Sequence, residues 1–310
     1  MTRIGNHAFD SCSGLTELTL PSVTSIRDEA FWGCTGLTEL TLPNSITSIG
    51  NSAFYGCSGL TELILPNSLR SIGESAFYGC SGLTELILPN SVTSIGESAF
   101  EGCTGMTKLT LPNSLVSIGE SAFWGCSGLT ELTLPNSVTS IGRQAFWGCS
   151  GLTELTLPNS VTSIGYDAFA YCSGLEKITV ESGNSCYDSR DNCNSIIDTE
   201  TNTLIVGCKN SIIPNSVTSI GESAFYGCSG LTELTLPSSV TRIGKNAFSD
   251  CSGLEKIISL AEIPPVCGSG GVFYGVNKTN CELIVPVISV IAYKLAEVWN
   301  KFSNIRGFSK

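Results

Sequence analysis

The residues best suited to chemistry in this chain are 15 cysteines and one histidine, His7. Ten cysteines recur at a step of mostly 23 residues, and they are Cys12, Cys34, Cys57, Cys80, Cys103, Cys126, Cys149, Cys172, Cys228 and Cys251. Such a series suggests disulfides in an exported protein. Stacked in register, however, their Cβ atoms would lie about 4.8 Å apart, wider than the ~3.8 Å of a disulfide. We predict a column of buried free thiols, and we leave open the states of Cys186, Cys193, Cys208, Cys267 and Cys281.

Enzymatic chemistry has little support in the sequence. Ser-His or Cys-His catalysis would depend on His7 alone, and no CxxC pair or glycine-rich phosphate loop occurs. One acidic and amide cluster could supply oxygen ligands to calcium, although its spacing fits no EF-hand and a solvated loop is the alternative. That cluster is Asp188, Asp191, Asn192, Asn194 and Asp198. We predict a non-enzymatic protein without a catalytic site, metal or cofactor.

The cysteines belong to a repeat, for which residues 129–151 (LTELTLPNSVTSIGRQAFWGCSG) are a typical unit. Its Ala-Phe pair recurs at Phe9, Phe31, Phe54, Phe77, Phe100, Phe123, Phe146, Phe169, Phe225 and Phe248. A fixed short period indicates a solenoid, because one unit cannot bury its apolar face without its neighbours. The alternation in LTELTLP predicts a strand with Leu132 and Leu134 inward.

The other parts of the unit predict a second strand, a turn and an amide column. Val138 and Ile141 predict the second strand, and RQAFWGC predicts one helical or 3₁₀ turn. The asparagine after the proline should satisfy turn backbone groups from coil to coil. It recurs at Asn44, Asn67, Asn90, Asn113, Asn136, Asn159 and Asn215.

The string A-F-x-G-C-x-x-L-x-x-L-x-L-P, seen from Ala145 to Pro158, resembles the BspA-like class of leucine-rich repeats. The resemblance implies a leucine-rich-repeat solenoid. It would be a β-rich, right-handed superhelix of ~23-residue coils with parallel strands, short helical turns and a C-terminal cap. It further implies a bacterial cell-surface or secreted protein with roles in adhesion and host-protein binding. The chain itself shows no signal peptide, which departs from the family pattern.

The period divides the chain into two parts. We expect the solenoid over residues 1–260, with a long repeat and a β-hairpin insert at about 181–213 around Thr199–Asn202. Residues 261–310 lose the period and predict a cap, with Val290, Ala292 or Tyr293, Leu295 or Ala296, and Trp299 on one helical face. No matching cap is visible at the other end, so we expect a monomer or end-to-end self-association.

Net charge and hydropathy limit the kinds of partner that the protein could bind. A net charge of −11 argues against nucleic acid, and no apolar run approaches the roughly 18 residues of a membrane span. We therefore expect a protein partner from host or matrix, with a glycan as the alternative.

Two predicted surface columns could carry this binding. The outward residues of the first strand are mostly acidic, which either attracts a basic partner or only discourages strand pairing. They are Glu17, Glu39, Glu62, Glu85, Lys108, Glu131, Glu154, Lys177, Glu233 and Lys256. The residue after each Phe forms two aromatic clusters, which either mark an interaction site or only shield the turn. The clusters are Trp32-Tyr55-Tyr78 and Trp124-Trp147.

The leading hypothesis is a binding or adhesion module that recognises a host or matrix protein through an extended solenoid surface. Glycan binding by the aromatic residues is the second, and a structural, self-assembling role is the third.

Overall fold

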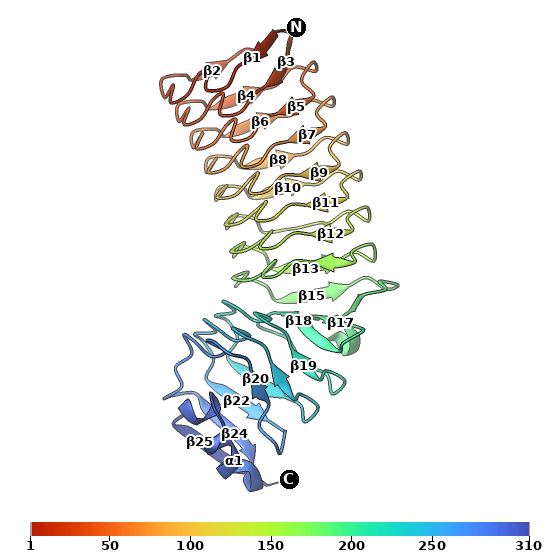
Figure 1. Ribbon diagram of the computed structural model, residues 1–310, viewed down its shortest axis with the longest axis vertical. Coiled ribbons are helices and arrows are strands. Elements are labelled where there is room, and N and C mark those ends of the chain that lie inside the picture. The colour runs from red at the N-terminus through yellow and green to blue at the C-terminus, as the bar shows by residue number, and fades with distance from the viewer. Residues whose placement is uncertain (1, 310) are drawn as a thin grey trace. The chain divides into compact units, whose positions relative to one another are not determined.

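The computed structural model describes residues 2–309, and the chain separates into two compact units. Unit 1 comprises residues 1–152 and 160–169, and unit 2 comprises residues 153–159 and 170–310. Both are built from stacked coils with short parallel strands, as predicted for the repeat. In unit 1 the strands form two columns, one on each side of the coils (Figure 1).

The first column of unit 1 comes from the LTELTLP segments, in which Leu alternates with exposed polar residues. Its strands pair in parallel with like residues opposite one another, as in Glu39↔Glu62 and Leu40↔Leu63. The predicted register is therefore confirmed here. These strands are β2 (Glu17–Leu18), β4 (Glu39–Thr41), β6 (Glu62–Ile64), β8 (Glu85–Ile87) and β10 (Lys108–Thr110).

The second column of unit 1 comes from the T-S-I segments, whose Ile points into the core. Its strands form one sheet in the order β1-β3-β5-β7 and another in the order β14-β12-β11-β9. They are β1 (Thr2–Ile4), β3 (Val23–Ile26), β5 (Ser48–Ile49), β7 (Ser71–Ile72), β9 (Ser94–Ile95), β11 (Ser117–Ile118), β12 (Ser140–Ile141) and β14 (Ser163–Ile164).

A turn segment carrying the Ala-Phe pair closes the third side of each coil. It forms no regular helix, but its local bonds run to the carbonyl three residues back, as in the predicted 3₁₀ turn. Alternate N–H groups bind the next coil, because Ser75, Phe77 and Gly79 donate to the carbonyls of Glu97, Ala99 and Glu101 at 2.7–2.8 Å. Only the groups between them bond locally, as Tyr78 does to Ser75. A continuous helix needs every N–H group for bonds along its own axis. Because alternate N–H groups here bond the next coil, the segment cannot extend into a helix.

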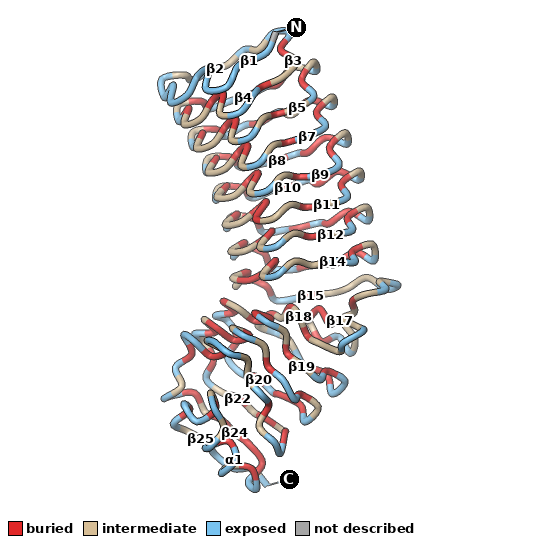
Figure 2. Tube along the Cα trace, viewed as in Figure 1, coloured by how far each residue is buried: buried red, intermediate tan, exposed pale blue. Residues whose placement is uncertain are grey.

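The core of unit 1 is a column of phenylalanine rings. Phe54, Phe77 and Phe100 are fully buried, with centroids 5.2 and 5.3 Å apart and planes within 4°. Ala, Cys and Leu of each coil fill the space beside the rings. Figure 2 shows the buried positions recurring at the same places along successive coils of unit 1. Repetition of one well-packed layer supplies the apolar burial that a single 23-residue coil lacks.

The cysteine column is confirmed as free thiols, and all 15 cysteines are free. Most thiols of the column also donate a hydrogen bond: Cys80 Sγ donates to the Phe54 carbonyl at 3.3 Å, and Cys103 Sγ to the Phe77 carbonyl at 3.4 Å. Cys12 in the first repeat is exposed. The buried thiols therefore join neighbouring coils as donors, besides filling space.

The asparagine column does not make the expected bonds. Within residues 2–309, Asn67 and Asn90 are exposed and no side-chain hydrogen bond is recorded for them. The serine after each asparagine bonds instead: Ser68 Oγ donates to the Ile46 carbonyl of the preceding coil at 2.6 Å. Ser114, Ser137, Ser160 and Ser239 repeat this contact at 2.6–2.8 Å. The serine points inward at this turn, whereas the asparagine points to solvent.

Unit 2 contains the same two strand columns with a hairpin between repeats. Strands β17 (Ser195–Asp198) and β18 (Thr203–Gly207) pair in antiparallel fashion, which confirms the predicted hairpin. β18 then pairs in parallel with β19 (Ser219–Ile220), so the hairpin continues a strand column. The sheet also contains β16 (Tyr187–Asp188), β21 (Arg242–Ile243) and β23 (Val266–Cys267), and the 3₁₀ turn η1 (Arg190–Asn192) precedes β17.

The other strands of this unit are β13 (Glu154–Leu157), β15 (Lys177–Val180), β20 (Glu233–Leu236), β22 (Lys256–Ser259), β24 (Glu282–Pro286) and β25 (Asn304–Phe308).

The final segment of unit 2 packs on the last coils. The 3₁₀ turn η2 (Val287–Ser289) leads into helix α1 (Val290–Leu295), and η3 (Trp299–Lys301) follows. Tyr293 and Trp299 are fully buried, whereas Leu295 is exposed. Trp299 contacts Phe273, whose ring stacks on Phe248. The proposed division at residue 260 stays a prediction.

Candidate functional site

The aromatic column lies on the turn side of the coils, one residue after the buried Phe. Two left-handed residues bracket this position, for example Ser75 (φ 52°) and Gly79 (φ 68°). The backbone between them directs Phe77 into the core and leaves Tyr78 half-buried at the surface. The predicted outward lean of the second residue is therefore present.

The first aromatic cluster is a stack of three rings. Trp32 and Tyr55 lie 3.9 Å apart at 6°, and Tyr55 and Tyr78 lie 4.4 Å apart at 0°. Because the rings stack from coil to coil, each covers its neighbour's face and presents its edge to solvent. The cluster ends at Glu101, whose negative charge raises the pKa of the Tyr78 hydroxyl, with partial burial adding to the shift.

The second aromatic cluster has a different geometry. Trp124 and Trp147 have centroids 5.5 Å apart, and their planes are inclined by 37°. Both indoles are half-buried. The two indole planes therefore do not lie face to face, whereas the rings of the first cluster do.

Some glutamates of the acidic column on the first strands lie beside a lysine, whereas others do not. Lys108 lies 2.5 Å from Glu85 in unit 1, and Lys177 lies 3.4 Å from Glu154 in unit 2. Within the described residues no ion pair is recorded for Glu17, Glu39 or Glu62, which pair in register on β2, β4 and β6. Glu131 is exposed. A hollow of 370 Å³ lies beside Glu17 and Glu39. The net negative stretch therefore belongs to the first three of these strands.

The structure does not bring all predicted site residues together. In each coil the aromatic residue lies on the turn side, whereas the glutamate lies on the first strand after the buried Cys and Leu, as with Tyr55 and Glu62. In unit 2, β13 carries Glu154. The two columns are thus separate surfaces, and a partner that used both would have to wrap around a coil.

The remaining acidic residues and the histidine have local contacts. Asp188 accepts two hydrogen bonds from Arg190 Nε, at 2.8 and 2.9 Å. Asp198 accepts from the backbone N–H and the hydroxyl of Thr201, both at 2.8 Å. His7 is exposed, with Nδ1 3.4 Å from a Glu29 carboxylate oxygen. Asp188 and Asp198 of the predicted acidic cluster are thus each bonded to a neighbouring protein group.

The repeat geometry agrees with comparison against known proteins. A sequence model of the BspA-type leucine-rich repeat region matches in six copies, over residues 2–126, 70–197 and 197–267. The chain belongs to this family. BspA-type repeat proteins are typically non-enzymatic, and membership suggests a binding or adhesion module.

Two solved structures resemble this BspA-type chain. A leucine-rich cell-surface protein from Faecalibacterium prausnitzii is 28% identical, with a TM-score of 0.70 over 93% of this chain and 84% of that one. A leucine-rich repeat protein from Bacteroides ovatus is 26% identical, with a TM-score of 0.64 over 99% and 81%. The comparison with curated proteins gives no match. Among residues 2–309, no helix has the length and apolar character to span a bilayer.

The sequence reasoning missed a group of arginines on the second strands of unit 1. Arg3, Arg27 and Arg70 lie on or directly beside β1, β3 and β7. Arg27 occupies the position held by Gly50 and Gly73 in the following BspA-type coils. A comparison of departures from the repeat, rather than of its recurring residues, would have found them.

Proposed function

We propose that the protein is a non-enzymatic adhesion module that recognises a host or matrix protein through the aromatic column of unit 1. The observation that carries this proposal is the pair of aromatic clusters, in which half-buried rings stand at the surface of consecutive coils. Trp and Tyr are the residue types that most often dominate binding energy at protein interfaces. Location at a cell surface is part of the proposal, supported by the surface protein of Faecalibacterium prausnitzii.

The ring geometry favours a protein over a glycan at the first cluster. A sugar ring stacks on an aromatic face, and the parallel stack covers both faces of Tyr55 and one face each of Trp32 and Tyr78. Their exposed edges suit the side chains of a protein, since edge contacts are common between aromatic groups. A partner would bury these edges together with the neighbouring turn backbone.

The acidic stretch of Glu17, Glu39 and Glu62 contributes to binding in our proposal. Three unneutralised carboxylates in register attract a basic segment and accelerate its association. Glu85 and Glu154 contribute less because each lies beside a lysine, and the exposed Glu131 adds a single charge. The aromatic clusters would then supply affinity and the glutamates the rate of encounter.

Binding of the full chain to immobilised extracellular-matrix proteins, including collagen and laminin, tests the proposal. For a matrix protein that binds, the double variant Trp32→Ala/Tyr55→Ala should weaken the affinity at least about 30-fold, the size expected of a hot spot. Tyr274→Ala, which removes an exposed ring in unit 2, is the matched control and should change affinity less than about twofold. Equal losses in the two variants, or unchanged affinity in the double variant, would reject the aromatic column.

Glycan binding is the second candidate, and the inclined rings of Trp124 and Trp147 favour it. A sugar ring could stack on an indole there, because the two indole planes are inclined rather than parallel. A neutral-glycan array decides between the two functions. Signal on the array that disappears in Trp124→Ala/Trp147→Ala supports glycan recognition, whereas a silent array with matrix binding rejects it.

A further inference from the structure

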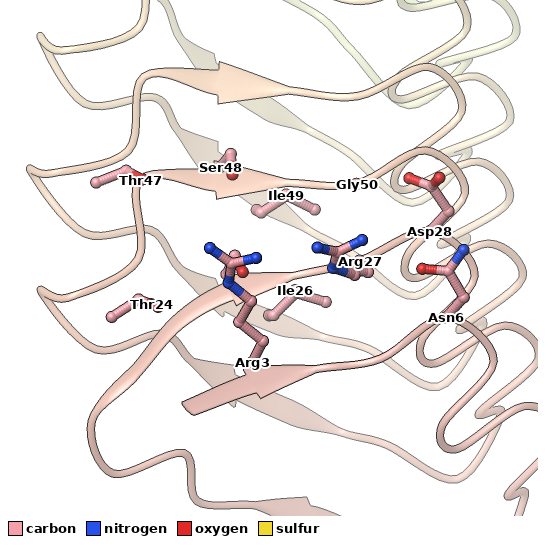
Figure 3. Close-up of a pocket in the computed structure, with 11 residues that line it drawn as sticks. Arg3, Asn6, Thr24, Ile26, Arg27, Asp28, Thr47, Ser48, Ile49 and Gly50 are labelled. Atoms are coloured by element: carbon pink, nitrogen blue, oxygen red, sulfur yellow. The ribbon is translucent and has the colours of Figure 1, made fainter. Parts of the chain in front are cut away.

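An open depression lies over the sheet of second strands at the first coils of unit 1. Its volume is 560 Å³, and β1, β3 and β5 line it. Figure 3 shows the guanidinium groups of Arg3 and Arg27 lying over β3, with Asn6 and Asp28 at one end. Ser25 and Ser48 add hydroxyl groups to the lining, and the buried side chains of Ile26 and Ile49 lie beneath. The depression is therefore polar and contains two neighbouring cations.

These cations are unusual because they lack acidic partners. Unit 1 has five Lys and Arg residues. Lys108 pairs with Glu85 and Arg143 with Glu120, at 2.5 and 3.2 Å. For Arg3, Arg27 and Arg70, no ion pair with any described residue is recorded. In a chain with a net charge of −11, the three Lys or Arg residues of this unit without an ion pair to a described residue therefore all lie on one sheet.

All three arginines are departures from the repeat, since Arg3 of β1 lies opposite Ser25 of β3, at a serine position. Arg27 stands where later coils have Gly50, Gly73 and Gly96, and Arg70 stands where neighbouring coils have Thr47 and Thr93. The glycine position suits a tight approach of coils, since a Cβ on Gly50 would come within 2.6 Å of Arg27 backbone. These changes place positive charge on a sheet face that is otherwise lined by hydroxyl groups.

The one carboxylate in the depression is already used by the fold. Asp28 Oδ1 accepts the backbone N–H of Asn51 from the next coil at 2.8 Å. In the same way, Asn51 Oδ1 accepts the N–H of Glu74 at 3.0 Å, so this contact belongs to coil stacking. Asp28 lowers the positive potential of the depression, but the two guanidinium groups still outnumber it.

We propose that this depression binds a short anionic saccharide, with Arg3 and Arg27 holding its carboxylate or sulfate group. Guanidinium groups bind planar carboxylates and sulfates through paired hydrogen bonds. The hydroxyl groups of Ser25 and Ser48 and the amide of Asn6 suit sugar hydroxyls, whereas an apolar peptide side chain finds no exposed apolar wall. A long polyanion is repelled by the acidic chain as a whole, so the ligand is short. The site lies on the second strands, apart from the aromatic column, and does not depend on the adhesion proposal.

Calorimetric titration of the full chain at low salt tests this proposal with three probes. They are a trimer of galacturonic acid, a sulfated trisaccharide and the corresponding neutral trisaccharide. At least one acidic probe should bind, and binding should weaken as salt is raised. The carboxylated and sulfated probes distinguish the two sources of negative charge, and either one supports the site.

The variant Arg3→Gln/Arg27→Gly should weaken binding of the acidic probe at least about tenfold. Arg27→Gly restores the residue of the later coils, so folding should be retained, and a thermal melt checks this. Lys108→Gln removes the same kind of charge from the first-strand column and should leave the affinity within twofold. Equal weakening by Lys108→Gln, equal binding of the neutral trisaccharide, or tighter binding of an acidic hexapeptide than of either acidic sugar would overturn the proposal.

Discussion

Two residue columns lie next to each other on the turn side of unit 1, and they differ in almost every physical property. The inner column, from Phe31 to Phe146, consists of Phe at every coil, and each ring is fully buried. The outer column, one residue later, contains Trp, Tyr and Glu and is half-buried. The inner position is uniform because one ring must fit between two identical rings. The outer position has no such restriction, so it is where variation between coils can produce recognition.

The largest expected effect is a loss of folding stability at alkaline pH, which the buried thiols cause. Burial raises the pKa of the Cys57 and Cys103 thiols to about 12, whereas an unfolded cysteine titrates near 8.5. The unfolded chain therefore loses protons first, and stability falls as pH rises above about 9. Each buried thiol should cost about 1.4 kcal/mol per pH unit in that range. Urea denaturation at pH 8, 9 and 10 measures the loss.

A single cysteine variant provides the control for this prediction. Cys103→Ala should lower the slope of stability against pH by the contribution of one thiol proton. A free energy of unfolding that stays constant between pH 8 and 10 would contradict the buried column.

Truncation of one ring in each column gives the next largest effect. Phe77→Ala leaves a cavity between Phe54 and Phe100 and should cost about 3–5 kcal/mol in the free energy of unfolding. Tyr78→Ala removes a surface ring and should cost no more than about 1.5 kcal/mol, the range for an aromatic pair. Chemical denaturation of both variants measures the difference. Similar costs would mean that the outer column is as much a part of the core as the inner one.

The sequence predicted the inner column well and the polar contacts poorly. Periodicity identifies burial, because only an in-register stack can bury Phe54, Phe77 and Phe100 together. Periodicity does not decide which of two adjacent polar residues bonds, since that depends on the local backbone direction. Asn67 and Ser68 recur equally, yet Ser68 makes the coil-to-coil bond. The i→i−3 bonds of the turn segment were expected, whereas the coil-to-coil backbone bonds that alternate with them cannot be seen in the sequence of a single repeat.

The candidate site shows the same limit. The aromatic clusters followed directly from the repeat position, and the rings lie together as expected. The inclination of Trp124 against Trp147, on which the glycan alternative depends, results from packing and could not be read from residue types. Arg27 was missed because the site prediction used residues that recur from coil to coil, and Arg27 does not recur.

A methyl group added at a glycine where two coils approach closely should destabilise unit 1, but by less than the loss of a buried ring. A Cβ at Gly119 would lie 2.6 Å from the Ile95 carbonyl oxygen, whereas a Cβ at Gly5 has no atom within 4 Å. Gly119→Ala should therefore destabilise unit 1 by about 1–3 kcal/mol, as overpacking does. Gly5→Ala at the same repeat position should change stability by less than about 0.5 kcal/mol. A thermal melt of each variant measures this, and equal melting temperatures would contradict close stacking.

Charge substitutions on the first strands should change the free energy of unfolding least. Removal of a lysine should lower stability, whereas removal of an unpaired glutamate should not. Lys108→Gln breaks the contact with Glu85 and should cost about 0.2–1 kcal/mol, as exposed ion pairs do. Glu39→Gln removes a carboxylate that stands between Glu17 and Glu62, so it should leave stability unchanged or raise it by a few tenths of a kcal/mol. Both changes should shrink at 1 M salt, where exposed charges are screened. Chemical denaturation at low and high salt measures the pair, and a loss of stability in Glu39→Gln would show that the acidic strands are held by contacts other than those described.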